Sequence, residues 1–361
     1  MAEIRLENLS FRYPNATADT LAELNLAVAR GEAHALLGGS GAGKSTLLNL
    51  LSGLLPVDGG SIFFDGEDVA DRAPLERRVS QVFQFPVLYE AMTVEQNLQF
   101  PLRCTGATRE TRRARASEIA SLLDLNGLLD RRPAQLSLVQ KQLVAIGKSL
   151  VRPDVSLVLL DEPLTAAQPA YKWQLRQALK SVQRELGTTM VYVTHDQTEA
   201  LTFADRISVL HEGRIVQTGT PEALVEDPRH EHVGYFVGSP GMNFLEATIE
   251  NGRYRLAGID VVGTGAAAGV CRLGFRPEWA RITSAAVDAA EVVRLPVEIL
   301  HTRILGTRQQ QLHGLVTARC GGQILTTRQA LAGVSTGSGW LNVNAARLLG
   351  FRDGERIDDA L

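Results

Sequence analysis

The 361-residue sequence lacks most of what marks a secreted, membrane-spanning or metal-cluster protein. Cys104, Cys271 and Cys320 are few, far apart and odd in number, which indicates unpaired thiols in a reducing compartment. No apolar run approaches the roughly 18 residues of a membrane-spanning helix. The N-terminus, MAEIRLENLSFRY, carries charges where a secretory signal has its apolar core. We therefore expect a cytosolic chain that reaches a membrane only through a partner.

The sequence also has no excess of positive charge. Its formal net charge of −3 gives no general electrostatic attraction to nucleic acid, although a local basic patch remains possible. With 45% hydrophobic and 21% charged residues, the composition is that of an ordinary globular protein of two to three domains.

A glycine-rich stretch, HALLGGSGAGKSTLLNLLSGLL, follows an apolar strand pattern and leads into a helix pattern. Its glycines allow consecutive backbone N–H groups to surround phosphates, and the helix that begins near Lys44 presents its positive end to them. Lys44 is expected to reach the terminal phosphates, and Ser45 to bind magnesium. The alternative is a glycine-rich turn that binds nothing. The predicted nucleotide-binding residues of this loop are Gly38, Gly39, Ser40, Gly41, Ala42, Gly43, Lys44, Ser45 and Thr46.

Two further predicted strands end in residues suited to ATP hydrolysis. VSLVLLDEP is an apolar strand that ends in Asp161, placed to hold magnesium through water, and Glu162, placed to polarise an attacking water. TTMVYVTHDQTEAL repeats the pattern and ends at His195, whose imidazole is expected to contact the γ-phosphate. Read alone, the acidic pair would be helix-capping chemistry and the histidine would be structural.

These motifs resemble the ATP-binding subunit of an ABC transporter across essentially the whole chain. The resemblance implies that Tyr13, in FRYP, stacks on adenine, although a Tyr beside Pro is equally typical of a packed turn. It also implies that Gln84, in QVFQFPVLYEAMTVEQNL, binds the metal and links it to the segment that receives the membrane subunit. The alternative is an ordinary polar loop residue.

The closing segments narrow the resemblance to ATPases of carbohydrate-uptake importers, relatives of the maltose-importer ATPase. They are LTFADRISVLHEGRIVQTGTPEALVEDP and VGYFVGSPGMNFL. Within that class, QVFQFPVLYEAMTV, YKWQLR and VYVTHDQTEALTFAD look most like one of the two unlike ATPases of bacterial glycerol importers. The resemblance implies ATP and Mg²⁺ as cofactors, two permease subunits, a solute-binding protein, and a place on the cytoplasmic face of the bacterial inner membrane. It implies no nucleic-acid partner, and glycerol as the solute rests on analogy alone.

The signature motif departs from the family pattern. An LSGGQ-like sequence normally caps a helix that faces the ATP held by the opposite subunit, and Ser137 and Gln140 of QLSLVQKQ match it. Leu138 and Val139 replace its two glycines, which allow close approach of the backbone and left-handed conformations. Gln168 also replaces the usual aspartate of the loop after Glu162.

From these departures we expect an asymmetric ATPase heterodimer whose second ATPase subunit carries an intact signature. The alternatives are a tolerated variant with two working sites, or a regulatory ATP-binding subunit that hydrolyses little. A soluble ABC protein acting on DNA or ribosomes would usually carry two fused ATPase units or a long coiled coil, and neither pattern is present.

The expected fold is an α/β P-loop ATPase core followed by a small all-β barrel of the oligonucleotide-binding (OB) type. The core is predicted over 1–240, with a helical insertion over about 87–150, and the regulatory barrel over 241–361. LGFRPEWARI resembles an element of the regulatory barrel of importer ATPases. The barrel lacks the aromatic ladder that binding of single-stranded nucleic acid needs. The basic flank RETRRARAS is expected to be a solvated helix face.

Overall fold

The computed structural model describes the chain except residues 166–167, 257, 264–265, 286–290, 309–310 and 358–361. The chain divides into two compact units, Met1–Glu222 and Ala223–Leu361. In the described part of the chain, no helix is long and apolar enough to cross a membrane.

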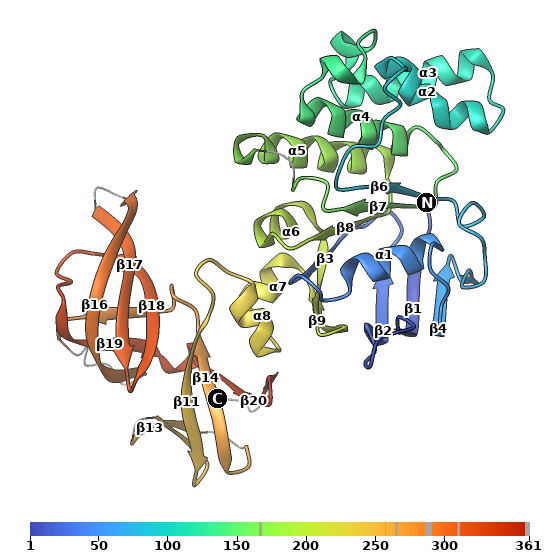
Figure 1. Ribbon diagram of the computed structural model, residues 1–361. Helices are drawn as coiled ribbons and strands as arrows, with labels where there is room; N and C mark the ends of the chain where they lie inside the picture. Colours follow the sequence, from blue (N-terminus) through green and yellow to red (C-terminus); the bar gives the residue numbers. More distant parts are fainter. Residues whose placement is uncertain (166–167, 257, 264–265, 286–290, 309–310, 358–361) are drawn as a thin grey trace. The chain divides into compact units, whose positions relative to one another are not determined.

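A six-stranded sheet forms the centre of the first unit, with the strand order β10-β9-β3-β8-β7-β6 (Figure 1). Its strands pair in parallel except β10, which is antiparallel to β9. The carboxyl ends of β3, β7 and β8 therefore lie at one edge, where an α/β sheet binds its ligands. The strands are β3 (Ala33–Gly38), β6 (Val79–Val82), β7 (Leu157–Asp161), β8 (Met190–Thr194), β9 (Arg206–His211) and β10 (Arg214–Gly219).

Both faces of this sheet are covered, so its central strands read as unbroken apolar runs. On β7, Leu157 and Leu159 enter the core that contains helix α1, whereas Val158 and Leu160 enter the core formed with the helical segment. A second, antiparallel sheet with the order β2-β1-β4-β5 packs into the α1 core. The further elements are β1 (Ile4–Phe11), β2 (Leu21–Val28), β4 (Gly59–Phe64), β5 (Glu67–Asp68) and α1 (Lys44–Ser52).

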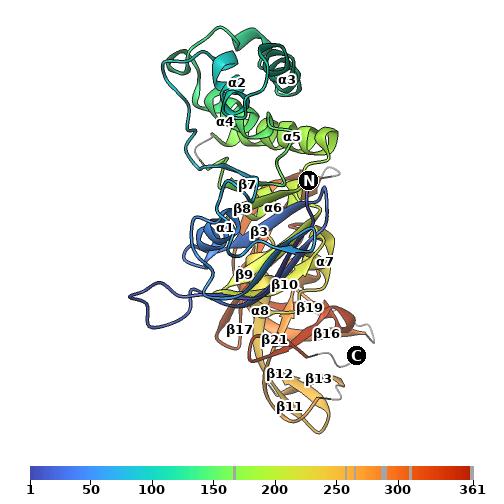
Figure 2. The same ribbon diagram turned by 90° about the vertical axis from the view of Figure 1, so that its right-hand side faces the viewer.

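The insertion predicted over about 87–150 is helical in the structure and gathers at one end of the first unit (Figure 2). Thr93 caps α2 and Ser137 caps α4, each in a capping box. The basic flank is partly structural, because Arg115 donates to the carbonyls of Leu150 and Val151. The helices of this unit are α2 (Val94–Cys104), α3 (Arg109–Leu122), η1 (Asn126–Leu128), η2 (Pro133–Gln135), α4 (Leu138–Leu150), α5 (Pro169–Leu186) and α6 (Gln197–Phe203).

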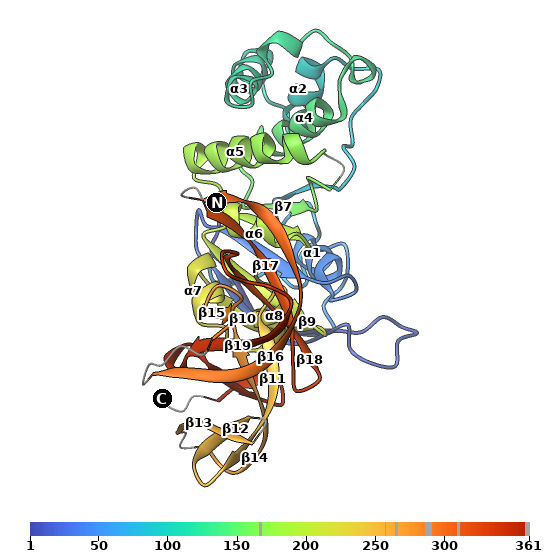
Figure 3. The ribbon, with the colours of Figure 1, turned by 90° about the vertical axis from the view of Figure 1, so that its left-hand side faces the viewer.

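From residue 243 onward the described elements are strands apart from one 3-10 turn, so the expectation of an all-β region is confirmed. They form a six-stranded sheet, β13-β12-β11-β14-β20-β21, and a five-stranded sheet, β15-β19-β16-β17-β18. The long strand β16 pairs with both β17 and β19 and curves across the five-stranded sheet (Figure 3). The elements are α7 (Pro221–Glu226), α8 (Glu231–Phe236), β11 (Asn243–Glu250), β12 (Arg253–Leu256), β13 (Ile259–Gly263), β14 (Gly269–Phe275), β15 (Ala280–Thr283), β16 (Val292–Arg308), β17 (Gln311–Cys320), β18 (Gln323–Ala330), β19 (Gly337–Asn344), η3 (Ala345–Arg347), β20 (Leu349–Arg352) and β21 (Glu355–Arg356).

A side chain bridges the two outer strands of the five-stranded sheet. Buried Gln329 on β18 accepts from the backbone N–H of Ile282 on β15 at 2.7 Å and donates to the Ile282 carbonyl at 2.8 Å. The amide thus supplies the two bonds that a neighbouring strand would supply. The sheet is bent far enough for its ends to meet, as in a barrel, while the OB-type topology stays a prediction.

A buried arginine organises the start of the second unit. Arg276, after β14, is fully buried and donates to the carbonyls of Leu224, Val225, Gly234 and Val237. These carbonyls belong to α7, α8 and their ends. The contacts explain why the two compact units divide before 223, whereas the sequence motifs set the predicted domain limit at 240.

We expect Arg276→Met to destabilise the second unit by roughly 3–5 kcal/mol, because buried carbonyls lose a charged donor and no water can replace it. Chemical denaturation followed by circular dichroism measures the change. The matched control is Arg319→Gln, which removes an exposed arginine paired with Glu298 in the same unit. This control should change stability by less than about 1 kcal/mol. Equal effects of the two substitutions would contradict the role given to Arg276.

Candidate functional site

The glycine-rich loop joins β3 to α1, as predicted. Gly43 caps α1 with a φ of 101°, in the left-handed region, where a Cβ would lie 2.6 Å from the Leu21 side chain. A Cβ on Gly38 would lie 2.5 Å from the Leu210 carbonyl oxygen. These two glycines are therefore required by backbone conformation and by packing.

Lys44 folds over this loop. Its Nζ donates to the carbonyls of Gly38 at 2.9 Å and Gly39 at 2.7 Å, and the residue is 7% exposed. Burial lowers the pKa of Lys44, while the nearby carboxylates of Glu162 and Asp161 oppose this shift. The sequence-predicted cation and carboxylates thus lie within electrostatic reach of one another.

The remaining loop residues differ in exposure. Ser40, Gly41 and Ser45 are exposed, Gly39 is half-buried, and Ala42 and Thr46 are buried. The Ser45 hydroxyl is thus available to a metal ion, whereas Thr46 packs inside.

Tyr13 shows features of both interpretations offered for it. Its hydroxyl lies 3.2 Å from the Thr46 hydroxyl, and its ring meets Phe11 edge-on with 4.9 Å between the centroids. The side chain is nevertheless 40% exposed. The ring is therefore held by α1 beside the glycine-rich loop, the predicted phosphate loop, and its exposed part is open to a planar ligand.

Asp161 and Glu162 stand at the end of β7. Burial, with the neighbouring Glu162 charge, raises the pKa of Asp161. Glu162 has a φ of 44°, a left-handed conformation that non-glycine residues rarely adopt and that recurs at functional sites. Its backbone N–H donates to the Val193 carbonyl on β8 at 3.0 Å, which ties this unusual conformation to the sheet.

The Glu162 carboxylate is positioned from two sides. His195 Nδ1 lies 3.0 Å from one carboxylate oxygen, and the Thr165 hydroxyl donates to the other at 3.1 Å. The structure thus brings together the two residues predicted for hydrolysis, one after β7 and the other after β8. Thr165 was not singled out from the sequence, because a threonine three residues after a glutamate carries no distinctive signal.

A buried network below His195 also escaped the sequence analysis. Glu199 is 1% exposed and accepts from the hydroxyls of Tyr192 at 2.9 Å and Thr194 at 2.8 Å. It also pairs with Lys172 of α5 at 2.8 Å, and burial beside Glu199 raises the pKa of Tyr192 well above its usual value. The pattern HDQTE carried a usable signal, since Asp196 followed three residues later by a glutamate is typical of a helix N-terminus, and Asp196 does cap α6.

Gln84 lies two residues beyond β6 and is half-buried. Val82 at the end of β6 is paired with Leu160 of β7, so Gln84 and Asp161 leave the sheet at the same edge. This placement agrees with a shared metal site. The same loop exposes a row of large apolar side chains, Phe83, Phe85, Val87 and Tyr89.

The signature motif lies apart from the phosphate loop, at the start of α4. Ser137 accepts from the Gln140 N–H at 3.2 Å, and the Gln140 side chain accepts from the Ser137 N–H at 2.9 Å. Leu138 and Val139 occupy the first helical turn and have no left-handed φ. The argument that glycine is needed here for a left-handed conformation is therefore wrong, because a helix N-terminus is formed with ordinary dihedral angles. The other argument, that the Leu138 side chain is bulky, still applies, because this side chain is 45% exposed at the start of the helix.

Part of the loop after Glu162, residues 166–167, lies outside the described residues. Gln168, predicted to replace an aspartate, is exposed and precedes α5. The three thiols are free, as expected, with Cys104 exposed and the other two buried.

Comparisons with known proteins show the family of the chain. The ABC transporter family model matches residues 21–165. The chain is 40% identical over 303 residues to the sn-glycerol-3-phosphate import ATP-binding protein UgpC of Chromohalobacter salexigens, covering 83% of this chain and 81% of the relative. It belongs to the ABC transporter family. UgpC of Rhizobium meliloti is 40% identical over 315 residues, with 87% and 88% covered.

A second type of relative is the trehalose import ATP-binding protein SugC of Mycobacterium tuberculosis, which is 44% identical over 249 residues. This match covers 69% of the chain and spans 63% of that relative's length.

Among solved structures, cbiO1 of Clostridium perfringens, part of an ABC transporter complex, matches 61% of the chain with a TM-score of 0.58 and 30% identity. The ATP-binding cassette MJ0796, a dimer bound to ADP and phosphate, matches 60% with a TM-score of 0.53 and 30% identity.

Proposed function

We propose that this ABC protein hydrolyses ATP to energise import of a small polyol, sugar or related phosphate ester. One observation supports hydrolysis above all: Glu162 is held by His195 and Thr165 at the sheet edge that also carries the phosphate loop and Lys44. A site built only to bind nucleotide has no need of a carboxylate positioned in this way.

In this proposal, each residue has a distinct task. The loop around Gly43 and the α1 N-terminus bind the phosphates, Lys44 neutralises their charge, and Glu162 accepts a proton from the attacking water. His195 donates through Nδ1 to Glu162 and keeps Nε2 for the terminal phosphate. Tyr13 stacks on the adenine ring through its exposed face.

The residues present fit a magnesium ion. Ser45 offers an exposed hydroxyl, Asp161 a carboxylate and Gln84 an amide, all oxygen ligands of the kind that Mg²⁺ prefers. No group of three or more His, Cys, Asp or Glu residues suited to a metal occurs in the described part of the chain. Retention of the metal would thus depend on the phosphates as well. When bound, Mg²⁺ would neutralise charge that develops on the phosphates.

The names of the relatives support a class of transported solute and a set of partners for this proposal. Their names describe import of sn-glycerol 3-phosphate and trehalose, which supports a polyol, sugar or phosphate-ester substrate and retains glycerol as a candidate. The permeases would receive the loop that exposes Phe83, Phe85, Val87 and Tyr89, and a solute-binding protein would work through them. Such an assembly would hold the chain at the cytoplasmic face of the bacterial inner membrane.

We further propose that the chain works in an asymmetric pair. Exposed Leu138 stands on the first turn of α4, where an opposing ATP would approach Ser137 and Gln140 of the helix cap. The side chain would hinder that approach and weaken one of two shared sites. A second ATPase subunit with an intact signature would complete the other site on this chain's own phosphate loop.

A hydrolysis assay of the purified chain, with a candidate partner ATPase added, tests the proposed function. We expect Mg²⁺-dependent release of phosphate that Lys44→Ala reduces by about 10² or more, since a positioned cation at the transferring phosphate is lost. Release that is unchanged by Lys44→Ala, or by removal of Mg²⁺, would contradict the proposal.

The buried network gives a separate prediction with a matched control. Lys172 pairs with Glu199 below His195, whereas Lys180, two turns along the same helix, pairs with Asp205. We expect Lys172→Gln to lower kcat by about ten-fold without a matching change in KM, because a small shift of the histidine misaligns Glu162. Lys180→Gln should leave kcat within about two-fold. Steady-state kinetics of both variants measure kcat and KM. Equal effects of Lys172→Gln and Lys180→Gln on kcat would show that Lys172 has a structural role only.

A further inference from the structure

A large pocket opens in the second unit, at the seam between β15 and β18. Its volume is about 1090 Å³, and it is lined by residues of β15, β16, β17 and β18 and of the turn after β18. Gln329 and Ile282, which are joined by two hydrogen bonds, are among the residues that line it. The pocket exists because these two strands are joined here by a side chain, and a continuous backbone ladder would have filled the seam.

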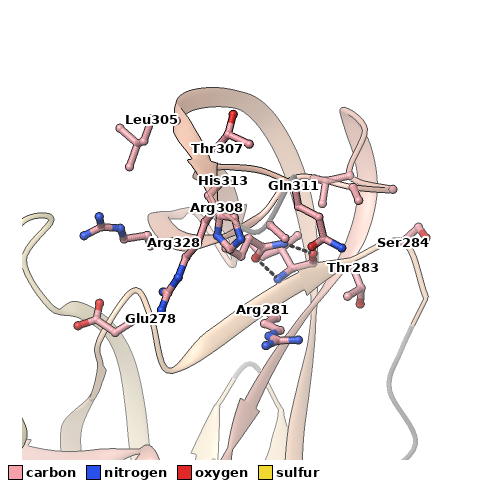
Figure 4. A pocket seen from close by; sticks show the side chains of 17 residues that line it. Glu278, Arg281, Thr283, Ser284, Leu305, Thr307, Arg308, Gln311, His313 and Arg328 are labelled. Atoms are coloured by element: carbon pink, nitrogen blue, oxygen red, sulfur yellow. Dashed lines mark hydrogen bonds between the residues drawn. The ribbon is translucent and has the colours of Figure 1, made fainter.

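The charged residues of this pocket are predominantly basic. Arg281 on β15, Arg308 on β16 and Arg328 on β18 surround it, together with His313 on β17, whereas Glu278 is its single carboxylate (Figure 4). This local excess contrasts with the chain as a whole, which has a formal net charge of −3. Arginines from three different strands thus line one pocket.

Among the described residues, these three guanidinium groups differ from most others of the second unit in their bonding partners. Most arginines of the second unit are bound to a carboxylate or a carbonyl, as Arg276 and Arg319 are. In the described ranges, no hydrogen bond or ion pair engages the side chains of Arg281, Arg308 or Arg328. Unpaired guanidinium groups around a shared hollow are suited to a phosphate, which can accept two parallel N–H bonds from each.

We propose that this pocket binds a small phosphate-bearing metabolite. The guanidinium groups of Arg281, Arg308 and Arg328 hold the phosphate, and the pocket volume accommodates an organic part of sugar size. His313 and Thr307 supply further polar groups toward that part. The site belongs entirely to the second unit and requires none of the residues assigned to ATP.

Isothermal titration of the full chain with glucose 6-phosphate tests the proposal. MgADP is present throughout at saturating concentration so that the phosphate loop cannot bind the probe. We expect saturable binding that weakens as salt rises, because the contacts are ionic and partly exposed. The double variant Arg281→Gln/Arg328→Gln should weaken binding by roughly ten-fold or more. Both residues are exposed, so the variant should fold normally, which circular dichroism verifies.

Two controls separate this site from general charge effects. Arg319→Gln removes an exposed arginine outside the pocket and should leave the affinity unchanged. Glu278→Gln removes the pocket's carboxylate and should tighten binding several-fold. A parallel titration with inorganic phosphate tells whether the phosphate alone is recognised or whether the organic part adds affinity. Absence of saturable binding of both probes, or equal weakening by all three variants, would overturn the proposal.

Discussion

Replacement of Glu162 by Gln is expected to lower ATP turnover by about 10²–10⁴-fold, the usual contribution of general acid–base catalysis. Glutamine keeps the shape of the side chain but cannot accept the proton of the attacking water. Nucleotide affinity should stay close to that of the unaltered protein, because the phosphate loop and Lys44 are untouched. Phosphate release and equilibrium binding of ATP, measured on the same preparation, separate these two effects.

The geometry around Glu162 makes this test specific. His195 and Thr165 each hold one of its carboxylate oxygens. The amide introduced by Glu162→Gln keeps one oxygen to accept from His195 and turns its NH2 toward the Thr165 hydroxyl, which can accept as well as donate, so the side chain stays in place but loses acceptor capacity. Glu185→Gln, on the exposed part of α5, is the matched control and should leave turnover unchanged.

Glu162→Gln also distinguishes the two candidate roles of the chain. If the chain drives transport by its own hydrolysis, uptake in cells that carry only Glu162→Gln should collapse together with turnover. If it is a regulatory ATP-binding subunit, uptake should persist although this chain no longer hydrolyses ATP. Persistence of uptake would therefore refute the energising role while leaving nucleotide binding in place.

Replacement of Leu138 and Val139 by glycine is expected to raise hydrolysis by the isolated chain on the order of a hundred-fold, the value of a restored donor to a phosphate clamp. The double variant removes the side chain that stands 45% exposed on the first turn of α4. The test measures the ATPase rate of the variant as a function of ATP concentration. The rate of the repaired homodimer should rise cooperatively with ATP concentration.

Stability changes accompany this substitution and must be measured beside it. Val139 packs against the helical core, and glycine costs about 1 kcal/mol per helical position, so the double variant should melt earlier. Leu138→Ala keeps a Cβ and should give a smaller gain. Leu75→Gly, at another exposed leucine, controls for the loss of apolar surface. An unchanged rate in a folded double variant would mean that Leu138 and Val139 are a tolerated variation.

The sequence predicted where the central residues of the candidate site lie in the fold, because the determinants of their position are local. The loop from Gly38 to Thr46 needs consecutive residues between a strand and a helix, and a parallel strand delivers its last residues to a known edge of the sheet. Asp161, Glu162 and His195 could therefore be placed from strand patterns alone, and the structure brings Glu162 and His195 within hydrogen-bonding distance.

The supporting contacts could not be predicted in the same way. Lys172 and Glu199 are 27 positions apart, and only the packing of α5 against α6 reveals their ion pair. The left-handed conformation of Glu162 was equally invisible, since nothing in its residue type favours it. Leu138 shows the reverse case, because its position was identified correctly from the motif while the conformational reason given for it was wrong.

The central claim is that this chain supplies sound hydrolytic residues to one site and an obstructed signature to the other. The most direct test is the ATPase rate of the chain alone, of a partner ATPase alone, and of an equimolar mixture carrying Glu162→Gln in this chain or the matching substitution in the partner. We predict a weak homodimer, an active mixture, and loss of nearly all activity only when Glu162 of this chain is replaced. Strong cooperative hydrolysis by the homodimer, or equal losses from either substitution, would contradict the account.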